Sequence, residues 1–217
     1  MTSTSVPPPT TPTRPQHSDK FVAYVLSLCE NKRVQSDLRT GLGLPVERCN
    51  YLHRYLVRRL PERLHRDAKR AHYAVAALIA ARPRAARDAD AERADQTDPV
   101  SDWPKRPNLG ASLAEATNAG VIKPDSAEGD LHLFSRQSSD ALHARLPALT
   151  RHLQSRGIAL DWAVLLEDLT WWDRDRDRIA TRWLENYFRT VNHGDGADDT
   201  DANTPVTDTT DLHEENI

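Results

Sequence analysis

Three aspartates separated by single arginines form the stretch of the chain in which metal or acid chemistry is easiest to imagine. Asp173, Asp175 and Asp177 stand two residues apart in WWDRDRDRIATRWLENYF. Carboxylates at positions 1, 3 and 5 begin a calcium-binding loop, but that loop also needs glycine at position 6 and a bidentate acid at position 12. These positions hold Arg178 and Leu184. We therefore expect no metal site.

The same stretch fits the start of a helix. Asp173 can cap a new helix, because unpaired amide groups and the helix dipole favour acids in the first turn. Ile179, Trp183 and Tyr187 then share an inward face, and Glu185 can pair with the arginine four residues later. The outward arginines are Arg178, Arg182 and Arg189. We predict an inter-helix corner with a basic face.

Catalytic signatures are absent from the sequence. The nine histidines are scattered, and there is no H-E-x-x-H, no G-x-S-x-G and no phosphate loop beyond a weak GLG. Glu167 and Asp168 lie opposite the apolar face of their helix, so we expect solvent to keep both ionised. A general acid would need burial or a neighbouring like charge. We predict a protein that is not an enzyme and needs no cofactor.

The hydrophobic pattern between the chain ends is helical throughout. The expected helices are one capped by Ser18, one from Pro45 through Leu60, the very apolar AHYAVAALIAA before Pro83, and four more around residues 111–118, near Leu131, from Ser139 and from Asp161. No segment alternates as a strand would. The fold class is therefore all-α, with two small helical lobes.

Composition divides the chain into five parts. Segments without apolar side chains cannot repay the entropy of ordering, and a stretch of small, charged and proline residues is typical of a connection. The predicted parts are a disordered tail at 1–17, an N-terminal basic helical lobe at 18–87, a linker or long loop at 88–108, a C-terminal helical lobe at 109–190 and an acidic disordered tail at 191–217.

Charge is distributed unevenly along the chain. Residues 14–87 carry 16 Lys and Arg against 6 Asp and Glu, whereas residues 190–217 carry 8 acids and no base. Arginine outnumbers lysine, 24 to 5, and the planar guanidinium group binds phosphate in a bidentate manner. A basic half followed by an acidic tail favours a surface that binds polyanions.

Cysteine usage and hydropathy indicate the cellular compartment of the protein. Cys29 and Cys49 belong to no zinc motif and are expected to be buried apolar groups in a reducing compartment. No apolar run approaches the length of a membrane span, and the first seventeen residues lack the apolar core of a signal peptide. We expect a cytoplasmic protein without membrane contact.

Exposed cations are the strongest candidates for binding. Arg54 and Arg58 lie four residues apart, on the face opposite Leu52 and Leu56. The cations that extend this surface are Lys32, Arg33, Arg39, Arg66, Lys69 and Arg70. Repeated cations suit the phosphate backbone, which carries no base information. A solvated helix face without a partner is the alternative explanation of this charge.

Four segments carry a resemblance to a known family. They are SDLRTGLG at 36–43, LGASLAEA at 109–116, LFSRQSSDAL at 133–142 and LDWAVLLEDLTWWDRDRDRIATRWLENYF at 160–188. In order and spacing they resemble the small subunit of the type I-E CRISPR surveillance complex Cascade, the CasB family.

The resemblance implies an all-helical protein without catalytic activity, present in more than one copy in a ribonucleoprotein. Such a subunit would contact the backbone and large subunits and help to hold guide RNA, target strand and displaced strand. Arg39 matches the amino-terminal arginine of the family, Arg136 its Phe-x-Arg position and Arg174 a basic position after the Trp pair.

We therefore predict a non-enzymatic, sequence-independent nucleic-acid-binding subunit of Cascade that stabilises the guide-paired state in antiviral defence. The predicted contacts are Arg39, Arg54, Arg58, Arg136, Arg174 and Arg178, with Lys32, Arg33, Lys69 and Arg70 as secondary ones. The alternatives are a helix-turn-helix DNA-binding regulator, a purely structural spacer and a metal-dependent nuclease built on the three aspartates.

Overall fold

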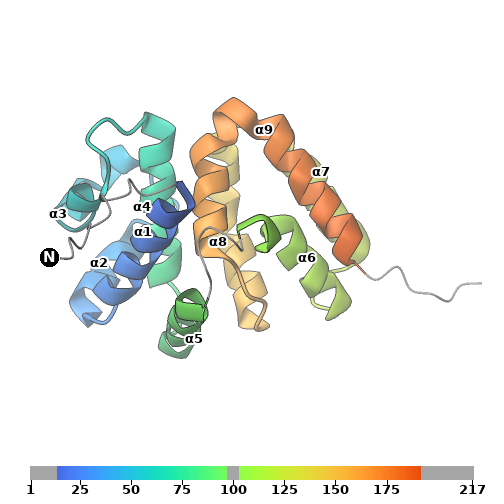
Figure 1. The fold of residues 1–217 in the computed structure, drawn as a ribbon, viewed down its shortest axis with the longest axis horizontal. Coiled ribbons are helices and arrows are strands. Elements are labelled where there is room, and N and C mark those ends of the chain that lie inside the picture. The colour runs from blue at the N-terminus through green and yellow to red at the C-terminus, as the bar shows by residue number, and fades with distance from the viewer. Residues whose placement is uncertain (1–13, 97–102, 192–217) are drawn as a thin grey trace, which may run out of the picture.

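A computed structural model describes residues 14–96 and 103–191, which form helices and short connections without any strand (Figure 1). The α-helices are α1 (Arg14–Leu28), α2 (Lys32–Thr40), α3 (His53–Leu56), α4 (Arg66–Ala80), α5 (Arg84–Gln96), α6 (Leu109–Asn118), α7 (Pro124–Phe134), α8 (Ser139–Ser155) and α9 (Trp162–Thr190). The predicted all-α class is confirmed. Within these ranges, no helix is apolar over a stretch long enough to cross a membrane.

Helix α1 begins at Arg14, four residues before the cap that the sequence indicated. Ser18 is therefore inside the helix, where it is buried and donates its hydroxyl to Glu167 Oε2 at 3.2 Å. The local sequence pattern places Ser18 at a helix end, but its hydrogen bond to Glu167 on α9 satisfies the hydroxyl inside the helix. Residues 14–17 are helical, contrary to the prediction of a tail through residue 17. The rest of both predicted tails lies outside the described residues, apart from Val191.

Residues 45–60 are not the continuous helix that their periodicity predicted. They form three 3-10 turns, η1 (Val46–Arg48), η2 (Asn50–Leu52) and η3 (Val57–Arg59), with the single-turn α3 between the last two. Cys49 and Leu52 are fully buried, so the predicted inward face is correct. The Tyr24 hydroxyl donates to the Tyr55 carbonyl at 2.6 Å and occupies an acceptor that a continuous helix would use.

Helices α4 and α9 form the centre of the molecule. Helix α4 contains the stretch predicted to be most buried, and Ala71, Val75 and Ile79 in it have no solvent exposure. The first half of α9 lies beside α4 and the second half beside α6 and α7 (Figure 1). A single cluster of buried apolar side chains includes residues of both predicted lobes. The two groups of helices therefore share one core.

Helix α5 occupies much of the segment predicted to be a linker or long loop, so that prediction is wrong for residues 88–96. Asp90 is buried, pairs with Arg82 and accepts a hydrogen bond from Trp162 Nε1 at 2.9 Å. Arg87 donates to the Arg82 carbonyl. These polar contacts fix a helix whose apolar pattern is weak. Beyond α5, residues 97–102 lie outside the described residues, and Trp103–Lys105 forms the 3-10 turn η4.

Candidate nucleic-acid interface

The three aspartates of the Asp-Arg run lie at a bend of α9 and serve different partners. Asp173 Oδ1 accepts a hydrogen bond from the Ser139 amide at 3.1 Å, so it supports the start of α8, whose N-cap is Ser138, and does not cap a new helix of its own. Asp175 has non-helical backbone angles, φ −127° and ψ 25°, and marks the bend. It pairs with Arg178 at 2.8 Å, and Asp177 pairs with its neighbour Arg176 at 3.4 Å. The predicted corner is present as a bend in α9, but Asp173 contacts the start of α8 and does not cap the second half of α9.

No metal-binding group assembles from these carboxylates. Within the described ranges, no three or more His, Cys, Asp or Glu side chains are placed to hold an ion. Asp175 and Asp177 each have an arginine partner, and a guanidinium opposes a divalent cation. The geometry therefore gives no support to the alternative of a nuclease built on this run.

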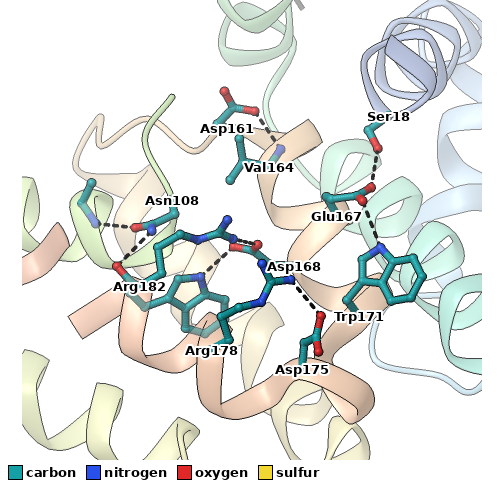
Figure 2. Close-up of polar contacts among 12 residues, drawn as sticks. Ser18, Asn108, Asp161, Val164, Glu167, Asp168, Trp171, Asp175, Arg178 and Arg182 are labelled. Atoms are coloured by element: carbon teal, nitrogen blue, oxygen red, sulfur yellow. Dashed lines mark hydrogen bonds and ion pairs between the residues drawn. The ribbon is translucent and has the colours of Figure 1, made fainter. Parts of the chain in front are cut away.

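Asp168 is buried, contrary to the prediction that solvent surrounds it. Its side chain is 2% exposed, pairs with Arg182 and accepts a hydrogen bond from Trp183 Nε1 at 2.7 Å (Figure 2). Burial raises the pKa of Asp168 to about 6, although Arg182 acts in the opposite direction. Arg182, predicted on the outward basic face, is thus tied to a buried acid. No local pattern reveals this, because both partners follow the bend.

Helix α6 docks against the second half of α9. Asn108 Nδ2 donates to the Arg182 carbonyl at 3.3 Å, and a Cβ atom built on Gly110 would lie 1.8 Å from the Trp183 carbonyl oxygen. Only glycine permits this approach. The rings of Trp172 and Trp183 lie 4.8 Å apart, centroid to centroid, inside the bend. Trp162, Trp172 and Trp183 are therefore core residues, and the inward face of Ile179, Trp183 and Tyr187 is confirmed.

Glu167 is partly buried, so the expectation of full solvation fails for it too. It accepts hydrogen bonds from Ser18 Oγ and, at 2.9 Å, from Trp171 Nε1 (Figure 2). The Arg174 guanidinium lies over the Trp171 ring, 5.5 Å from its centroid. Glu167 thus links α1 to α9 and orients the tryptophan against which a predicted contact, Arg174, packs.

The structure exposes amino-terminal cations on α2, α3 and η3, segments that hydrogen bonds hold next to each other. The members of this α2–α3 basic face are Arg33, Arg39, Arg54, Arg58 and Arg59, which are all exposed. Two bonds hold the two segments together: Tyr55 donates its hydroxyl to Asp37 Oδ2 at 2.6 Å, and the hydroxyls of Thr40 and Tyr51 lie 2.7 Å apart. None of the five arginines forms an ion pair with a described residue. Arg59 was absent from the predicted contacts, although it adjoins Arg58.

A second group of cations gathers where α8 begins and α9 bends. Trp172 Nε1 donates to the Gln137 carbonyl at 3.1 Å, and the Ser139–Asp173 bond lies beside it. These bonds place the exposed side chains of Arg136 and Arg174 at the same corner. The other predicted cations differ: Arg70 pairs with Asp140 on α8, Arg178 pairs with Asp175, Lys69 is half-buried, and Lys32 stands at the exposed start of α2.

Arg106 is a buried arginine that the sequence did not reveal. Its side chain is 9% exposed and binds two carboxylates, Asp19 at 2.8 Å and Asp161 at 2.6 and 2.7 Å. Asp161 also caps α9, as predicted, by accepting from the amides of Ala163 and Val164 (Figure 2). Arg106 falls in the predicted linker and instead ties α1 to the start of α9.

The model of one protein family matches most of the chain. It is described as CRISPR-associated protein Cse2 and matches residues 34–188. The chain belongs to the Cse2 family. Cse2 is the CasB protein of type I-E Cascade, so the resemblance read from the four segments is confirmed.

Two solved structures contain chains similar to this Cse2-family protein. A chain of a "CRISPR RNA-guided surveillance complex" is 36% identical, with a TM-score of 0.69 over 82% of this chain and 95% of that one. A chain of a "CRISPR RNA-guided surveillance complex, pre-nicking" is 37% identical, with a TM-score of 0.70 over 82% of this chain and 96% of that one. Among curated proteins there is no match.

Three of the four family segments meet around α9 in this Cse2-family chain. Gly110 of LGASLAEA contacts Trp183, and Gln137 and Ser139 of LFSRQSSDAL contact Trp172 and Asp173. The remaining segment, SDLRTGLG, ends α2 and carries an arginine of the α2–α3 basic face. The family segments thus shape the bend of α9 and one of the two cationic surfaces.

Proposed function

We propose that this chain is a non-catalytic subunit of a type I-E Cascade complex that holds nucleic-acid backbone without reading base sequence. Its ligands would be guide RNA, target strand and displaced strand, and its protein partners the backbone and large subunits and a second copy of itself. Membership of the Cse2 family supports this proposal, as does the similarity to chains of CRISPR RNA-guided surveillance complexes.

The α2–α3 basic face is the observation that carries the proposal. Its five arginines are exposed and have no carboxylate partner among the described residues, so their charge is available to a polyanion. Phosphates repeat at every nucleotide and are identical in every sequence, which makes such a surface salt-sensitive and sequence-tolerant.

The energetics of strand exchange give this surface a role. A guide-paired RNA–DNA duplex is about as stable as the DNA duplex that it replaces, so protein contacts to the backbone can decide the balance. Arginines carried on folded helices and 3-10 turns supply such contacts without further ordering of the backbone. The subunit would therefore favour the open, guide-paired state.

The proposed contacts divide according to whether they already have an acidic partner. The contacts without an ion pair are Arg39, Arg54, Arg58, Arg136 and Arg174, with Lys32, Arg33 and Lys69 as secondary ones; Arg59 joins them by position. Arg178 and Arg70 are proposed to contribute less, because Asp175 and Asp140 already offset their charge.

Salt-dependent binding to single-stranded oligonucleotides tests the proposal. The variant Arg39→Ala, Arg54→Ala, Arg58→Ala should lower the slope of log K against log salt by about 2, at about 0.7 per lost phosphate contact. The matched control, Lys123→Ala, Arg151→Ala, Arg156→Ala, removes the same charge from exposed positions elsewhere that have no ion pair among the described residues, and it should leave the slope nearly unchanged. An equal effect of both variants would mean general charge attraction, and no effect of either would favour the structural spacer.

The other two alternatives have their own outcomes. A helix-turn-helix regulator would prefer one duplex over random DNA by about a thousandfold or more, which contradicts the proposal. A nuclease would cleave nucleic acid in the presence of magnesium or manganese and lose this activity on Asp175→Ala. We expect neither result.

A further inference from the structure

One aromatic ring lies within the α2–α3 basic face and takes no part in the core. Tyr51, in η2, is 36% exposed. The Thr40 hydroxyl donates to the Asp37 carbonyl at 2.7 Å, so it accepts the hydrogen bond from the Tyr51 hydroxyl. This bond fixes the ring against the end of α2. The ring is held in place at its hydroxyl while part of it stays open to solvent, where a ligand can contact it.

The other two tyrosines of this surface are already engaged. The guanidinium of Arg59 lies over the Tyr24 ring, 4.8 Å from its centroid, and that of Arg54 lies 5.6 Å from the centroid of Tyr55. In the described part of the chain, no aromatic ring or guanidinium covers Tyr51. Tyr51 is thus the tyrosine of this surface that is exposed and has no ring or guanidinium partner among the described residues.

One arginine is held beside the backbone of Tyr51. Arg54 Nε donates to the Tyr51 carbonyl at 3.1 Å, and this bond holds the Arg54 side chain beside η2. An exposed ring next to an arginine matches the two parts of a nucleotide, because the base can stack on the ring while an adjoining phosphate meets the guanidinium.

We propose that Tyr51 is a stacking platform for an unpaired base of a single-stranded nucleic acid, a phosphate of which lies on Arg54. This inference rests on the proposed function and adds the class of strand that the surface accepts. In a duplex, neighbouring base pairs cover the face of every base, so the platform has nothing to stack against. The surface therefore binds single strands in preference to duplexes, whatever their sequence.

Binding of the full-length chain to labelled 20-nucleotide strands tests the platform. Three ligands of each backbone, DNA and RNA, are compared: a mixed-sequence strand, an otherwise identical strand with several abasic sites, and the duplex. Wild type should bind the abasic strand about tenfold more weakly than the complete one, since stacking on an aromatic side chain contributes a factor of about 5 to 160. Abasic and complete strands carry the same phosphates, so their salt slopes should agree.

Variants separate stacking from charge. Tyr51→Ala and Tyr51→Leu should weaken binding to the complete strand about tenfold, with the salt slope and the abasic affinity unchanged. Tyr51→Phe keeps the ring and should stay within about twofold of wild type. Arg39→Ala, in contrast, should lower the salt slope by about 0.7 for both strands. Loss of the complete-strand preference in either the DNA or the RNA arm supports the proposal and identifies the strand on which Tyr51 acts.

The outcomes distinguish this inference from the proposed function. If wild type binds none of the ligands, the proposed function fails and the platform with it. If wild type binds complete and abasic strands equally, the platform is refuted while backbone binding stands, and this comparison needs no variant. An equal loss on both strands in Tyr51→Ala would mean that the tyrosine only positions Arg54, which also refutes stacking.

Discussion

The indole nitrogen of Trp183 donates a hydrogen bond to Asp168 Oδ2 at 2.7 Å, although fifteen residues separate the two on α9. In a straight helix they would lie roughly 22 Å apart along the axis. The bend at Asp175 removes that distance and lets Arg182 reach the same carboxylate. The buried acid Asp168 thus joins the two halves of α9. The first half packs against α4, and the second half packs against α6 and α7.

Removing this acid should destabilise the fold. Asp168→Ala leaves the Trp183 N–H without its acceptor and Arg182 without its counter-charge, and we expect a loss of about 3 kcal/mol in the free energy of unfolding. Asp168→Asn keeps an acceptor for Trp183 and should cost about 1 kcal/mol. Urea denaturation of both variants measures these losses, and Trp183→Phe, which removes the indole donor, is measured beside them. The exposed pair variant Glu185→Ala is the control and should stay within about 0.5 kcal/mol of wild type.

The same acid should give the stability a distinctive pH dependence. Burial raises the pKa of Asp168 from 3.8 to about 6, so the folded chain retains this proton where the unfolded chain has released it. Its contribution is fully present below about pH 4 and is lost as the pH rises through about 6. Thermal unfolding from pH 4 to 7 should show wild type losing stability relative to Asp168→Asn. Parallel curves for the two proteins would contradict the assigned burial.

His72 should act in the opposite direction. It is buried between α1 and α4 and faces Phe21 and His17, its Nδ1 lies 2.7 Å from the Ala68 carbonyl, and burial lowers its pKa to about 4. The neutral ring is therefore favoured in the folded chain, and its stabilisation is lost as the pH falls from about 6.5 through 4. His72→Phe should reduce the acid loss of stability in calorimetry at pH 7 and 4.5. The exposed His132→Gln is the comparison, and an equal reduction in that variant would count against this account.

Gly110 should be intolerant of a side chain. An alanine Cβ would lie 1.8 Å from the Trp183 carbonyl oxygen, so α6 must move away from α9. We expect Gly110→Ala to cost about 3 kcal/mol, as overpacking of backbone against backbone does. Gly129 on α7 has no atom within 4 Å of such a Cβ, and Gly129→Ala should stabilise the protein by about 0.5–1 kcal/mol. Urea midpoints test the pair, and similar midpoints would falsify the docking described for α6.

Arg70 and Arg136 should separate structural from binding cations. Arg70 is 18% exposed and pairs with Asp140, which joins α4 to α8, whereas Arg136 is exposed without an ion pair among the described residues. Arg70→Ala should lower the free energy of unfolding by about 1 kcal/mol and leave the salt slope of strand binding nearly unchanged. Arg136→Ala should lower the slope by about 0.7 at constant stability. If Arg70→Ala lowered the salt slope and Arg136→Ala lowered the stability, Arg70 would be the phosphate contact.

Much of the fold and of its basic surface follows from features that are local in the chain. The apolar period identified α4 and the inward faces before and after Asp175, because a helix buries residues three and four apart whatever its partners. The excess of arginine before residue 88 and the four family segments are likewise read directly along the sequence. These features were sufficient for the all-α class, the buried tryptophans and the family.

Only the tertiary structure decided which polar residues leave solvent. Asp168 is buried by Trp183 and Arg182, and Arg106 by Asp19 and Asp161, partners that no helical window contains together. The same holds for Asp90 in α5, for the 3-10 turns that replace a helix, and for Tyr51 among the arginines. A buried charge needs a charged or hydrogen-bonding partner, and here these partners come from residues far apart in the sequence. Which polar residues are buried is therefore decided by the tertiary fold.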